Sequence, residues 1–280
     1  MIHDRRLVIL TNDHGPEGIV AAESAAHVSC ILGAPVIRLR ETSWIKQIET
    51  LDRASLCFIA THGGFGEDGT LQQALETRGI RHTHSSSWAC ANMSNKHLTK
   101  LLYLSLSIET PGWYFQGRAY GKENPHSIWV SKPYNGGSKN GLVVSKQPKR
   151  QENVLSEVCI AGSLEVSVCV VGHAKPMAFP PLVRGRDVAN IGVLAVSTKI
   201  LPSRVRCLCT EAALNIHRAL GAYGVTKTDF ILDQEGGPWA IETDAHPALG
   251  PMRAAASQAR LAGFSYPAFI RLLLNEYVKI

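Results

Sequence analysis

Short apolar runs alternate with helical segments over the first 90 residues of the chain. The Ala-rich segment Glu17–Leu32, with Gly33 after it, and the segment Leu71–Arg78 have the composition of helices. Apolar runs with few polar positions predict strands that are buried on both faces of a parallel sheet. Ser55–Ala60 is such a run, and Leu7–Leu10 and Val36–Leu39 are two further predicted strands. The alternating order predicts a doubly wound α/β domain over residues 1–90.

The middle of the chain mixes one helix with several strands. A helix is predicted from an N-cap at Ser94 to Ser105, with Lys96 and Lys100 on one solvated face. Four apolar runs predict strands, the first two joined by a Gly-rich turn: Ile128–Pro133, Leu142–Ser145, Val154–Ile160 and Glu165–Val171. This combination predicts a central α+β domain over residues 91–178.

The last third of the chain begins with a segment of weak hydrophobic pattern. Gly172–Pro202 contains several prolines and is predicted to be a mostly irregular loop; long loops of this kind often act as active-site lids. Three later segments predict helices: Cys209–Ala222, Met252–Leu261 and Pro267–Val278. Between the first two, Thr226–Leu232 and Trp239–Thr243 predict a hairpin around a Gly-Gly-Pro turn. We expect these elements to form a third domain over residues 179–280.

Composition adds expectations about location and partners. The 280 residues, 45% of them hydrophobic, contain no apolar run long enough to span a membrane. The first residues lack the apolar core of a signal peptide, so we expect a cytoplasmic protein without membrane attachment. Seven cysteines without a Cys-x-x-Cys pair are typical of core residues in a reducing compartment. The net charge of +6 comes from scattered basic residues, which favours a small anion such as a nucleotide over nucleic acid.

The predicted hairpin contains three acidic residues. Asp229 lies near the start of its first strand, and Glu242 and Asp244 lie two apart at the end of the second. Residues two apart in a strand point to the same face, so the three carboxylates are expected to converge. Magnesium binds such oxygens together with substrate phosphates. The alternative is that these acids end solvated strands.

A glycine-rich stretch follows the third predicted strand, at the position where ligands of open α/β sheets bind. It runs from His62 to Thr70 with four glycines and leads into a helix, so its backbone amides suit an anion. A tight turn that requires glycines is the alternative. Farther along, Lys132 ends a strand before a Gly-rich flap, from which a lysine can reach a triphosphate.

Four fragments of the chain, in this order, resemble the motifs of the D-alanine–D-alanine ligase family of the ATP-grasp superfamily. The fragments are His62-Gly63 with Gly66-Glu67-Asp68-Gly69 and Gln72, Ser94-Asn95-Lys96 with Lys100, Lys132-Pro133 with Gly137-Ser138-Lys139-Asn140-Gly141, and Gly224 with Asp229-Phe230, Glu242-Thr243-Asp244 and Pro247. The resemblance covers most of the chain. It implies an N-terminal α/β domain followed by an ATP-grasp fold of two α+β subdomains, and it implies a homodimer.

The resemblance also implies a reaction and its ligands. In this family the carboxylate of one amino acid attacks the γ-phosphate of ATP, and the amine of a second amino acid attacks the resulting acyl phosphate. Such chemistry requires positioning and charge neutralisation more than covalent catalysis. By resemblance, the expected protein is a D-alanine–D-alanine ligase for peptidoglycan precursors. It is expected to use ATP and two magnesium ions, which manganese can replace.

The roles of individual residues follow from the same resemblance. For ATP, they are phosphate contacts from Lys96 and Lys132, a hinge strand at the adenine formed by Glu157, Val158, Cys159 and Ile160, a ribose contact from Glu165, and a lid lysine, Lys199. For the metal ions, they are Asp229, Glu242 and Asp244. For the amino acids and catalysis, they are Glu17 at the first ammonium, His62 near the first carboxylate, Ser138 between loop and lid, Lys227 at the oxyanion and Arg253 at the second substrate.

Departures from the family pattern concentrate on the side of the second substrate. Lys227 replaces an arginine, Asp244 an asparagine, Ile200 a tyrosine and Arg253 a serine. A lysine keeps the charge of an arginine but loses its bidentate fork. Three hypotheses therefore stay open: an active D-alanine–D-alanine ligase, an ATP-grasp ligase with a different acceptor, and a nucleotide-binding relative with weak catalysis.

Overall fold

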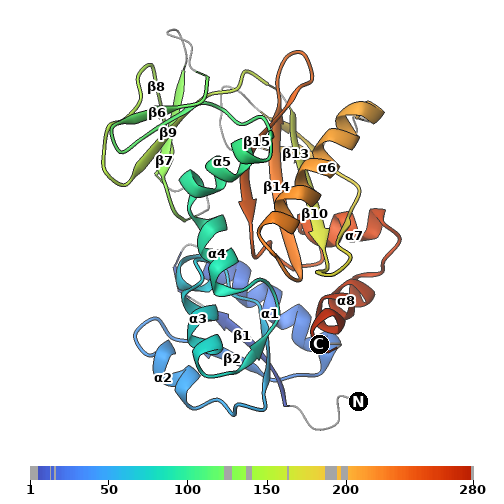
Figure 1. The fold of residues 1–280 in the computed structure, drawn as a ribbon. Helices are drawn as coiled ribbons and strands as arrows, with labels where there is room; N and C mark the ends of the chain where they lie inside the picture. The colour runs from blue at the N-terminus through green and yellow to red at the C-terminus, as the bar shows by residue number, and fades with distance from the viewer. Residues whose placement is uncertain are drawn as a thin grey trace.

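The structure, a computed structural model, describes residues 6–12, 14–15, 17–122, 128–136, 141–162, 164–186, 194–196 and 201–278. Its strands form three sheets, one in the lower part of Figure 1 and two side by side above it. This arrangement confirms the predicted combination of a parallel α/β unit with antiparallel α+β units. Within the described residues, no helix has the length and apolar character needed to cross a membrane.

The first sheet is parallel, with the strand order β2-β1-β3-β4. Its strands are β1 (Leu7–Asn12), β2 (Val36–Leu39), β3 (Leu56–Ile59) and β4 (Arg81–His82). The helices around it are α1 (Gly18–Leu32), α2 (Trp44–Glu49), α3 (Thr70–Thr77) and α4 (Ser87–Ser94). Alternate residues of β1 enter different cores, Ile9 on one face and Leu10 on the other. The strand is therefore buried on both faces, as its apolar run predicts.

The central sheet is antiparallel, with the order β6-β5-β9-β7-β8. It contains β5 (Trp113–Phe115), β6 (Arg118–Tyr120), β7 (Trp129–Pro133), β8 (Val143–Ser145) and β9 (Val154–Val158), and helix α5 (Lys96–Ser105) precedes it. The predicted N-cap at Ser94 is wrong, because Ser94 is the last residue of α4. Asn95 caps α5 instead, and its side chain accepts hydrogen bonds from the backbone N–H groups of His97 and Leu98. Asparagine caps a helix as well as serine does.

The third sheet has the order β13-β12-β10-β14-β15, with β11 paired to β10. Its strands are β10 (Leu164–Val171), β11 (Met177–Ala178), β12 (Leu182–Arg186), β13 (Leu194–Val196), β14 (Val225–Leu232) and β15 (Pro238–Asp244). The prediction of a mostly irregular loop over Gly172–Pro202 missed three short strands that lie in its described part. Their residues show no clear hydrophobic pattern, because strands toward the edge of a sheet are less buried. The division at residues 90 and 178 stays a prediction, while sheet pairing changes between β9 and β10.

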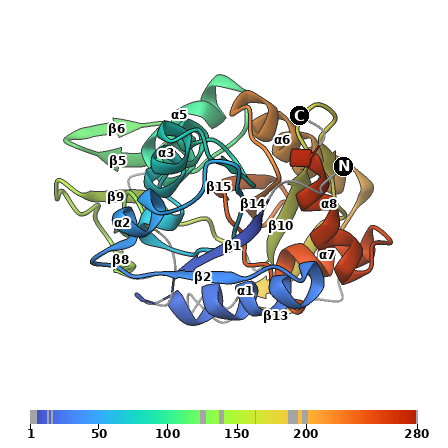
Figure 2. The same ribbon diagram turned by 90° about the horizontal axis from the view of Figure 1, so that it is seen from below.

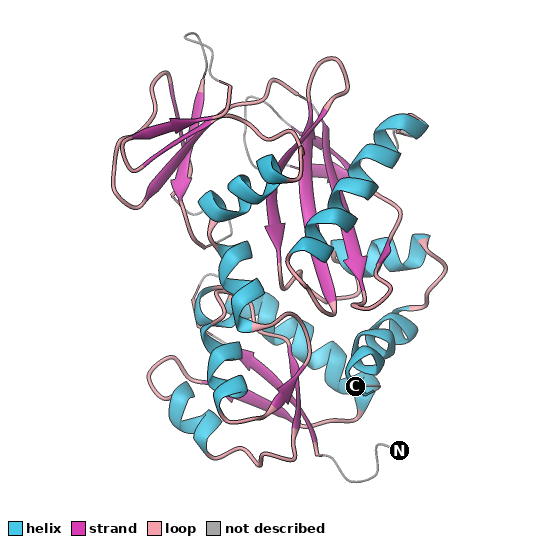
Figure 3. Cartoon of the chain, in the orientation of Figure 1, coloured by secondary structure: helices cyan, strands magenta, loops and turns pink. Residues whose placement is uncertain are grey.

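Helices cover both faces of the third sheet. Helix α6 (Ser203–Ala219) lies across one face, as Figure 3 shows, and packs on Val166, Val168 and Phe230. The other face meets α7 (Ala254–Leu261), and α8 (Tyr266–Val278) continues from α7 onto α1 of the first unit (Figure 2). One apolar core joins residues of β1, α1, β10, α7 and α8. The first and third sheets are consequently held together by a continuous core.

Candidate active site

Four charged side chains come from matching positions of the hairpin β14–β15. Lys227 pairs with Asp244 across the two strands, and Asp229 pairs with Glu242. A bulge between Asp229 and Phe230 shifts the register beyond this point. The hairpin confirms the prediction, but Asp229 lies in the middle of β14 instead of near its start, because the strand begins at Val225. The predicted convergence of acids therefore includes a lysine among them.

The ammonium of Lys227 lies between two of the predicted metal ligands. Its Nζ is 3.1 Å from Oδ2 of Asp229 and 3.6 Å from Oδ2 of Asp244. The other oxygens are also engaged: Ser167 Oγ donates to Asp229 at 2.6 Å, and the His246 N–H donates to Asp244 at 2.9 Å. Burial lowers the pKa of Lys227, but Asp229 and the neighbouring carboxylates outweigh burial and hold the pKa well above its usual value.

The two-ion site that the family resemblance implies is not tested by this arrangement. Among the residues that the structure describes, no three His, Cys, Asp or Glu side chains group closely enough to hold a metal ion. Asp229, Glu242 and Asp244 lie on one hairpin, yet both oxygens of each aspartate have partners within the protein. The role of these three residues as joint metal ligands stays a prediction.

A buried group of charges occupies the central unit. Lys132 and Lys100 each bind one oxygen of the Glu157 carboxylate, with Nζ–O distances of 2.5 and 3.0 Å. Lys100 also donates to Thr110 Oγ1 at 2.8 Å and to the Pro111 carbonyl at 3.1 Å. Burial raises the pKa of Glu157, but the two ammonium groups outweigh burial and lower the pKa to about 2. Burial lowers the pKa of Lys100 to about 8.

These contacts change two expectations from the sequence. The predicted solvated face of α5 is wrong, because Lys96 and Lys100 are both buried. The hinge role of β9 stays a prediction, yet the N–H groups of Val158 and Cys159 already donate to backbone carbonyls, at 2.8 and 2.7 Å. The side chain of Glu157 binds lysines. Sequence reasoning gave Lys100 no function of its own, and its neighbours in the sequence, Thr99 and Leu101, do not indicate that it is buried.

Lys96 links the central unit to the acidic hairpin. Its Nζ contacts the carbonyl of Gly136, after the strand that ends with Lys132 and Pro133, and its backbone N–H donates to Tyr134. Burial lowers the pKa of Lys96, while the carboxylates of Glu242, Glu157 and Glu67 oppose this effect. The charges of acids from all three units therefore influence the pKa of this lysine.

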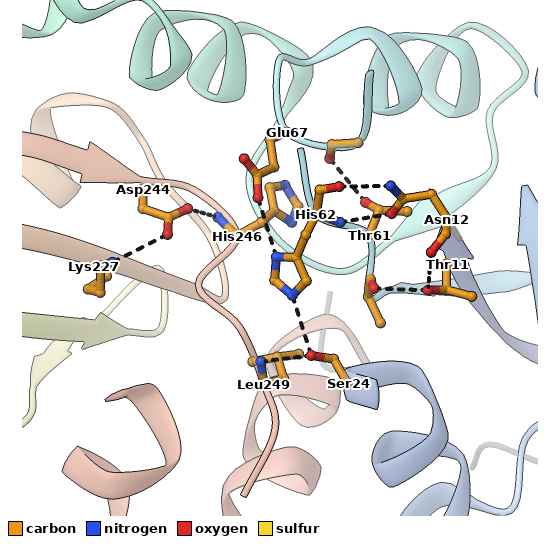
Figure 4. Close-up of polar contacts among 12 residues, drawn as sticks. Thr11, Asn12, Ser24, Thr61, His62, Glu67, Lys227, Asp244, His246 and Leu249 are labelled. Carbon is orange, nitrogen blue, oxygen red and sulfur yellow. Dashed lines mark hydrogen bonds and ion pairs between the residues drawn. The ribbon is translucent and has the colours of Figure 1, made fainter. Parts of the chain in front are cut away.

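The predicted anion loop carries an oriented histidine, shown in Figure 4. The Asn12 side chain, at the end of β1, accepts a hydrogen bond from the His62 backbone N–H at 2.9 Å and donates one to the His62 carbonyl at 2.8 Å. The His62 ring lies between Glu67, 3.3 Å from Nδ1, and Ser24, 3.4 Å from Nε2. Ser24 also accepts from the Leu249 N–H at 3.2 Å. The loop is therefore tied to α1 and to the segment before α7.

Two further acids lie beside this histidine. A Cβ atom at Gly63 would lie 2.5 Å from Oε2 of Glu17, so the loop and this carboxylate are close together, and the φ of +71° at Gly63 favours glycine there. Burial raises the pKa of Glu67, His62 opposes this effect, and Asp244 and Glu17 reinforce it. The charges of Glu17 and of Asp244 in the hairpin therefore act on Glu67. The sequence motif contains Glu67, but no role was predicted for it.

The remaining predicted residues lie at the margins or outside the described part. Arg253, at the N-cap of α7, binds Glu23 of α1 at 2.8 Å, and both side chains are partly exposed. Glu165 on β10 lies 4.0 Å from Arg184 of β12. Ser138 and Lys199 lie outside the described residues. Sequence reasoning missed Glu23 and Ser167, which nothing in their local sequence distinguishes.

Comparisons with known proteins give consistent results. No family model matches the chain. A D-alanine–D-alanine ligase from Nitrosospira multiformis is 32% identical, with 78% of each chain covered. A D-alanine–D-alanine ligase from Zymomonas mobilis is 27% identical over 99% of this chain and 95% of the relative.

Solved structures share the fold. The D-alanine–D-alanine ligase of Bacillus anthracis complexed with ATP superposes with a TM-score of 0.78 at 19% identity, covering 98% of this chain and 97% of that one. The VanG D-Ala:D-Ser ligase of Enterococcus faecalis gives 0.77 at 17% identity, with 98% and 99% covered. These likenesses extend over all three sheets.

Proposed function

We propose that the chain joins D-alanine to D-alanine for peptidoglycan precursors, because it belongs to the D-alanine–D-alanine ligase family and is an ATP-dependent ligase. The observation that carries the proposal is the meeting of three groups of charges. These are the lysines of the central unit, the acids of the β14–β15 hairpin and the His62 loop of the first unit; hydrogen bonds between Tyr103 and Thr243 and between Gln72 and His246 join the elements that carry them. A site with cations on one side and an oriented histidine on the other suits transfer of a phosphoryl group to a carboxylate.

On the nucleotide side, Lys96 and Lys132 bind the phosphates of ATP. Glu157 fixes the Lys132 ammonium, and Lys100 fixes Glu157, so the cation is oriented before ATP arrives. A preoriented charge costs little reorganisation during the reaction. Supported by this network, the γ-phosphoryl group moves to the first amino acid's carboxylate, giving an acyl phosphate and ADP.

On the substrate side, Glu17 binds the ammonium of the first amino acid, and His62 lies near its carboxylate. Glu67, Ser24 and Asn12 hold His62 in place. The amine of the second amino acid then attacks the acyl carbon, and inorganic phosphate leaves. Lys227 supplies positive charge near the oxyanion that this attack creates.

The proposal includes magnesium as the ion that accompanies ATP, with manganese as a substitute. It also includes a cytoplasmic location and a homodimer, both supported by the family resemblance.

An ATP-grasp ligase with a different acceptor is the second candidate. The observation that favours it is the pairing of both cations on the acceptor side with acids of the chain, Lys227 with Asp244 and Arg253 with Glu23. A carboxylate of the acceptor must displace one of these acids, whereas an acceptor without that group need not.

Phosphate release from ATP and magnesium, with and without D-alanine, tests the proposal, followed by mass analysis of the product. Release that depends on D-alanine, with formation of its dipeptide, is the expected result. Lys132→Met is expected to abolish it, while the matched exposed variant Lys122→Met retains it. Release with another amino acid only favours the second candidate. If no D- or L-amino acid of a full panel causes phosphate release although ATP binds, the hypothesis of a nucleotide-binding relative with weak catalysis is favoured.

A further inference from the structure

A chain of hydrogen bonds joins the end of the acidic hairpin to the glycine-rich loop. It begins at Asp244, whose Oδ1 accepts from the backbone N–H of His246 at 2.9 Å (Figure 4). The His246 ring continues it, because its Nε2 lies 3.0 Å from Nε2 of Gln72 in α3. The same Gln72 amide donates to the Gly66 carbonyl at 3.0 Å. His246 and Gln72 therefore connect two parts of the candidate site that lie far apart in the sequence.

The chemistry of these groups fixes the direction of the link. An amide nitrogen donates and does not accept, so Nε2 of His246 accepts from Gln72 and the neutral ring carries its proton on Nδ1. Gln72 uses its two N–H bonds on His246 and Gly66, which leaves its amide a single orientation. Gln72 is fully buried and His246 is 2% exposed, so water replaces neither partner.

The far end of the link holds the loop that carries His62 and Glu67. Thr61 Oγ1 also donates to the Gly66 carbonyl, at 3.2 Å, and a Cβ atom at Gly66 would lie 2.5 Å from this hydroxyl oxygen. The loop is therefore folded tightly against Thr61 and Gln72. A shift of the Gly66 carbonyl moves Glu67, the next residue, and with it the contact of Glu67 with Nδ1 of His62.

Side chains of the first unit enclose the His246 ring. Its Nε2 lies 3.4 Å from Sγ of Cys90 in α4, and its centroid lies 4.8 Å from that of the His84 ring. His84 has a φ of 72°, a left-handed conformation that is uncommon outside glycine, and strained residues of this kind cluster at functional sites. Thr83 Oγ1 fixes the His84 ring through Nδ1 at 2.9 Å. The first unit therefore determines where the imidazole of His246 lies.

We propose that His246 and Gln72 are positioning residues, which hold the acidic hairpin and the His62 loop at the separation that phosphoryl transfer requires. The inference rests on the proposed function, because it assumes that ATP binds beside the hairpin and the first amino acid beside His62. The γ-phosphoryl group then meets a carboxylate that the other unit holds. Both side chains of the link are buried, so they act through the loop and the hairpin and contact no substrate.

Steady-state kinetics of dipeptide formation by the full-length protein test the inference. His246→Leu removes the acceptor, and it is expected to lower kcat about a hundredfold, as a misplacement by about 1 Å does. The KM values for ATP and for the first D-alanine are expected to change by less than about threefold, because substrate binding is kept. In His246→Gln an amide oxygen accepts in place of Nε2, so this variant is expected to retain most of the wild-type kcat.

His217→Leu is the matched control, because His217 is equally buried and binds Thr226 and Gly172 outside the link. It is expected to leave kcat of the folded protein unchanged. Gln72→Leu is expected to lower kcat as far as His246→Leu does, and the double variant no further, since the two side chains form one link. If His246→Leu does not fold, Gln72→Leu decides. Additive losses, an unchanged kcat or a low kcat in His246→Gln overturn the inference.

Hydrogen exchange of backbone amides separates this inference from the proposed function, because it needs no substrate. In His246→Leu the amides of residues 62–70 are expected to exchange roughly tenfold faster than in the wild type, which corresponds to the loss of one buried hydrogen bond. His246→Gln and His217→Leu are expected to leave them unchanged. Equal exchange in His246→Leu and the wild type overturns the inference, whether or not a dipeptide forms. A wild type that shows the exchange difference but forms no dipeptide contradicts the proposed function instead.

Discussion

Ammonium and guanidinium groups bind carboxylates on both sides of the site, but water reaches them to different degrees. On the nucleotide side, the Lys100 side chain has no exposed surface and Glu157 is 6% exposed. On the acceptor side, Arg253 is 41% exposed and its partner Glu23 is 44% exposed. Buried ion pairs are costly to break, whereas exposed pairs contribute little to stability.

This difference indicates which part of the site is fixed before substrates bind. Lys132 has a single orientation because Glu157 and Lys100 hold it, and all three are enclosed. Arg253 can exchange Glu23 for a substrate carboxylate at a small cost in free energy. Of the departures from the family pattern, Arg253 belongs to this adaptable pair, whereas Lys227 is only 18% exposed and is bound to Asp229 and Asp244.

The largest expected effect follows from removal of the shared carboxylate. Glu157→Gln leaves Lys100 and Lys132 without their negative partner, so the free energy of unfolding is expected to fall by about 3–5 kcal/mol. Urea denaturation measures the change. Glu109→Gln, which removes an exposed carboxylate beside Lys122, is the control and is expected to cost less than about 1 kcal/mol. Equal losses in the two variants contradict the contrast between the two sides.

A pH series sharpens the same contrast. The pKa of Glu157 is about 2 in the folded protein against 4.5 as its ordinary value. Below pH 4.5 the Glu157 carboxylate binds a proton in the unfolded chain but stays ionised in the folded protein. Stabilisation by Glu157 is therefore complete above this pH and declines toward pH 2. The difference in unfolding free energy between wild type and Glu157→Gln is expected to shrink by about 2 kcal/mol from pH 6 to pH 3. A constant difference contradicts the prediction.

A smaller effect is expected where the two sides meet. Tyr103 of α5 forms a hydrogen bond with Thr243 of β15 at 2.8 Å, and Thr243 is also 3.1 Å from Thr228. Tyr103→Phe is expected to destabilise the protein by about 1 kcal/mol, because Thr243 keeps its second partner. Thermal unfolding of this variant, of Thr243→Val and of the double variant gives the coupling energy. Additive effects show that the hydrogen bond does not stabilise the fold.

The smallest effect is expected at the exposed pair. Glu23→Gln and Arg253→Gln should each lower the unfolding free energy by less than about 1 kcal/mol, with a coupling of similar size that disappears at high salt. A double-mutant cycle at low and high ionic strength measures it. A coupling above about 2 kcal/mol, insensitive to salt, shows that the acceptor side is as rigid as the nucleotide side.

Much of the fold follows from local patterns in the sequence. The strands β1, β2 and β3, the hairpin β14–β15 and the helices α7 and α8 lie within a few residues of their predicted positions. Apolar runs of this kind are buried in whichever tertiary arrangement forms. Short strands near a sheet edge, such as those in Gly172–Pro202, lack this pattern, because burial does not select their residues.

The site is harder to predict from the sequence, because its charged residues contact partners that are distant in the sequence. A lysine on a helix, such as Lys100, usually faces water, and only the distant Glu157 of β9 makes its burial possible. The contact between Lys227 and Asp244 depends on hairpin register, and the bulge after Asp229 changes that register. A sequence motif identifies such residues but does not determine their partners.

The position of α8 has a consequence for biosynthesis. Phe269 and Ile270 of this helix share a core with Ile9 and Val28 of β1 and α1, which are translated long before α8. The face of the first unit toward α8 therefore stays uncovered until α8 has been translated. During this interval the nascent chain exposes apolar surface of the kind that chaperones bind. Loss of α8 is expected to leave a polypeptide that aggregates during synthesis.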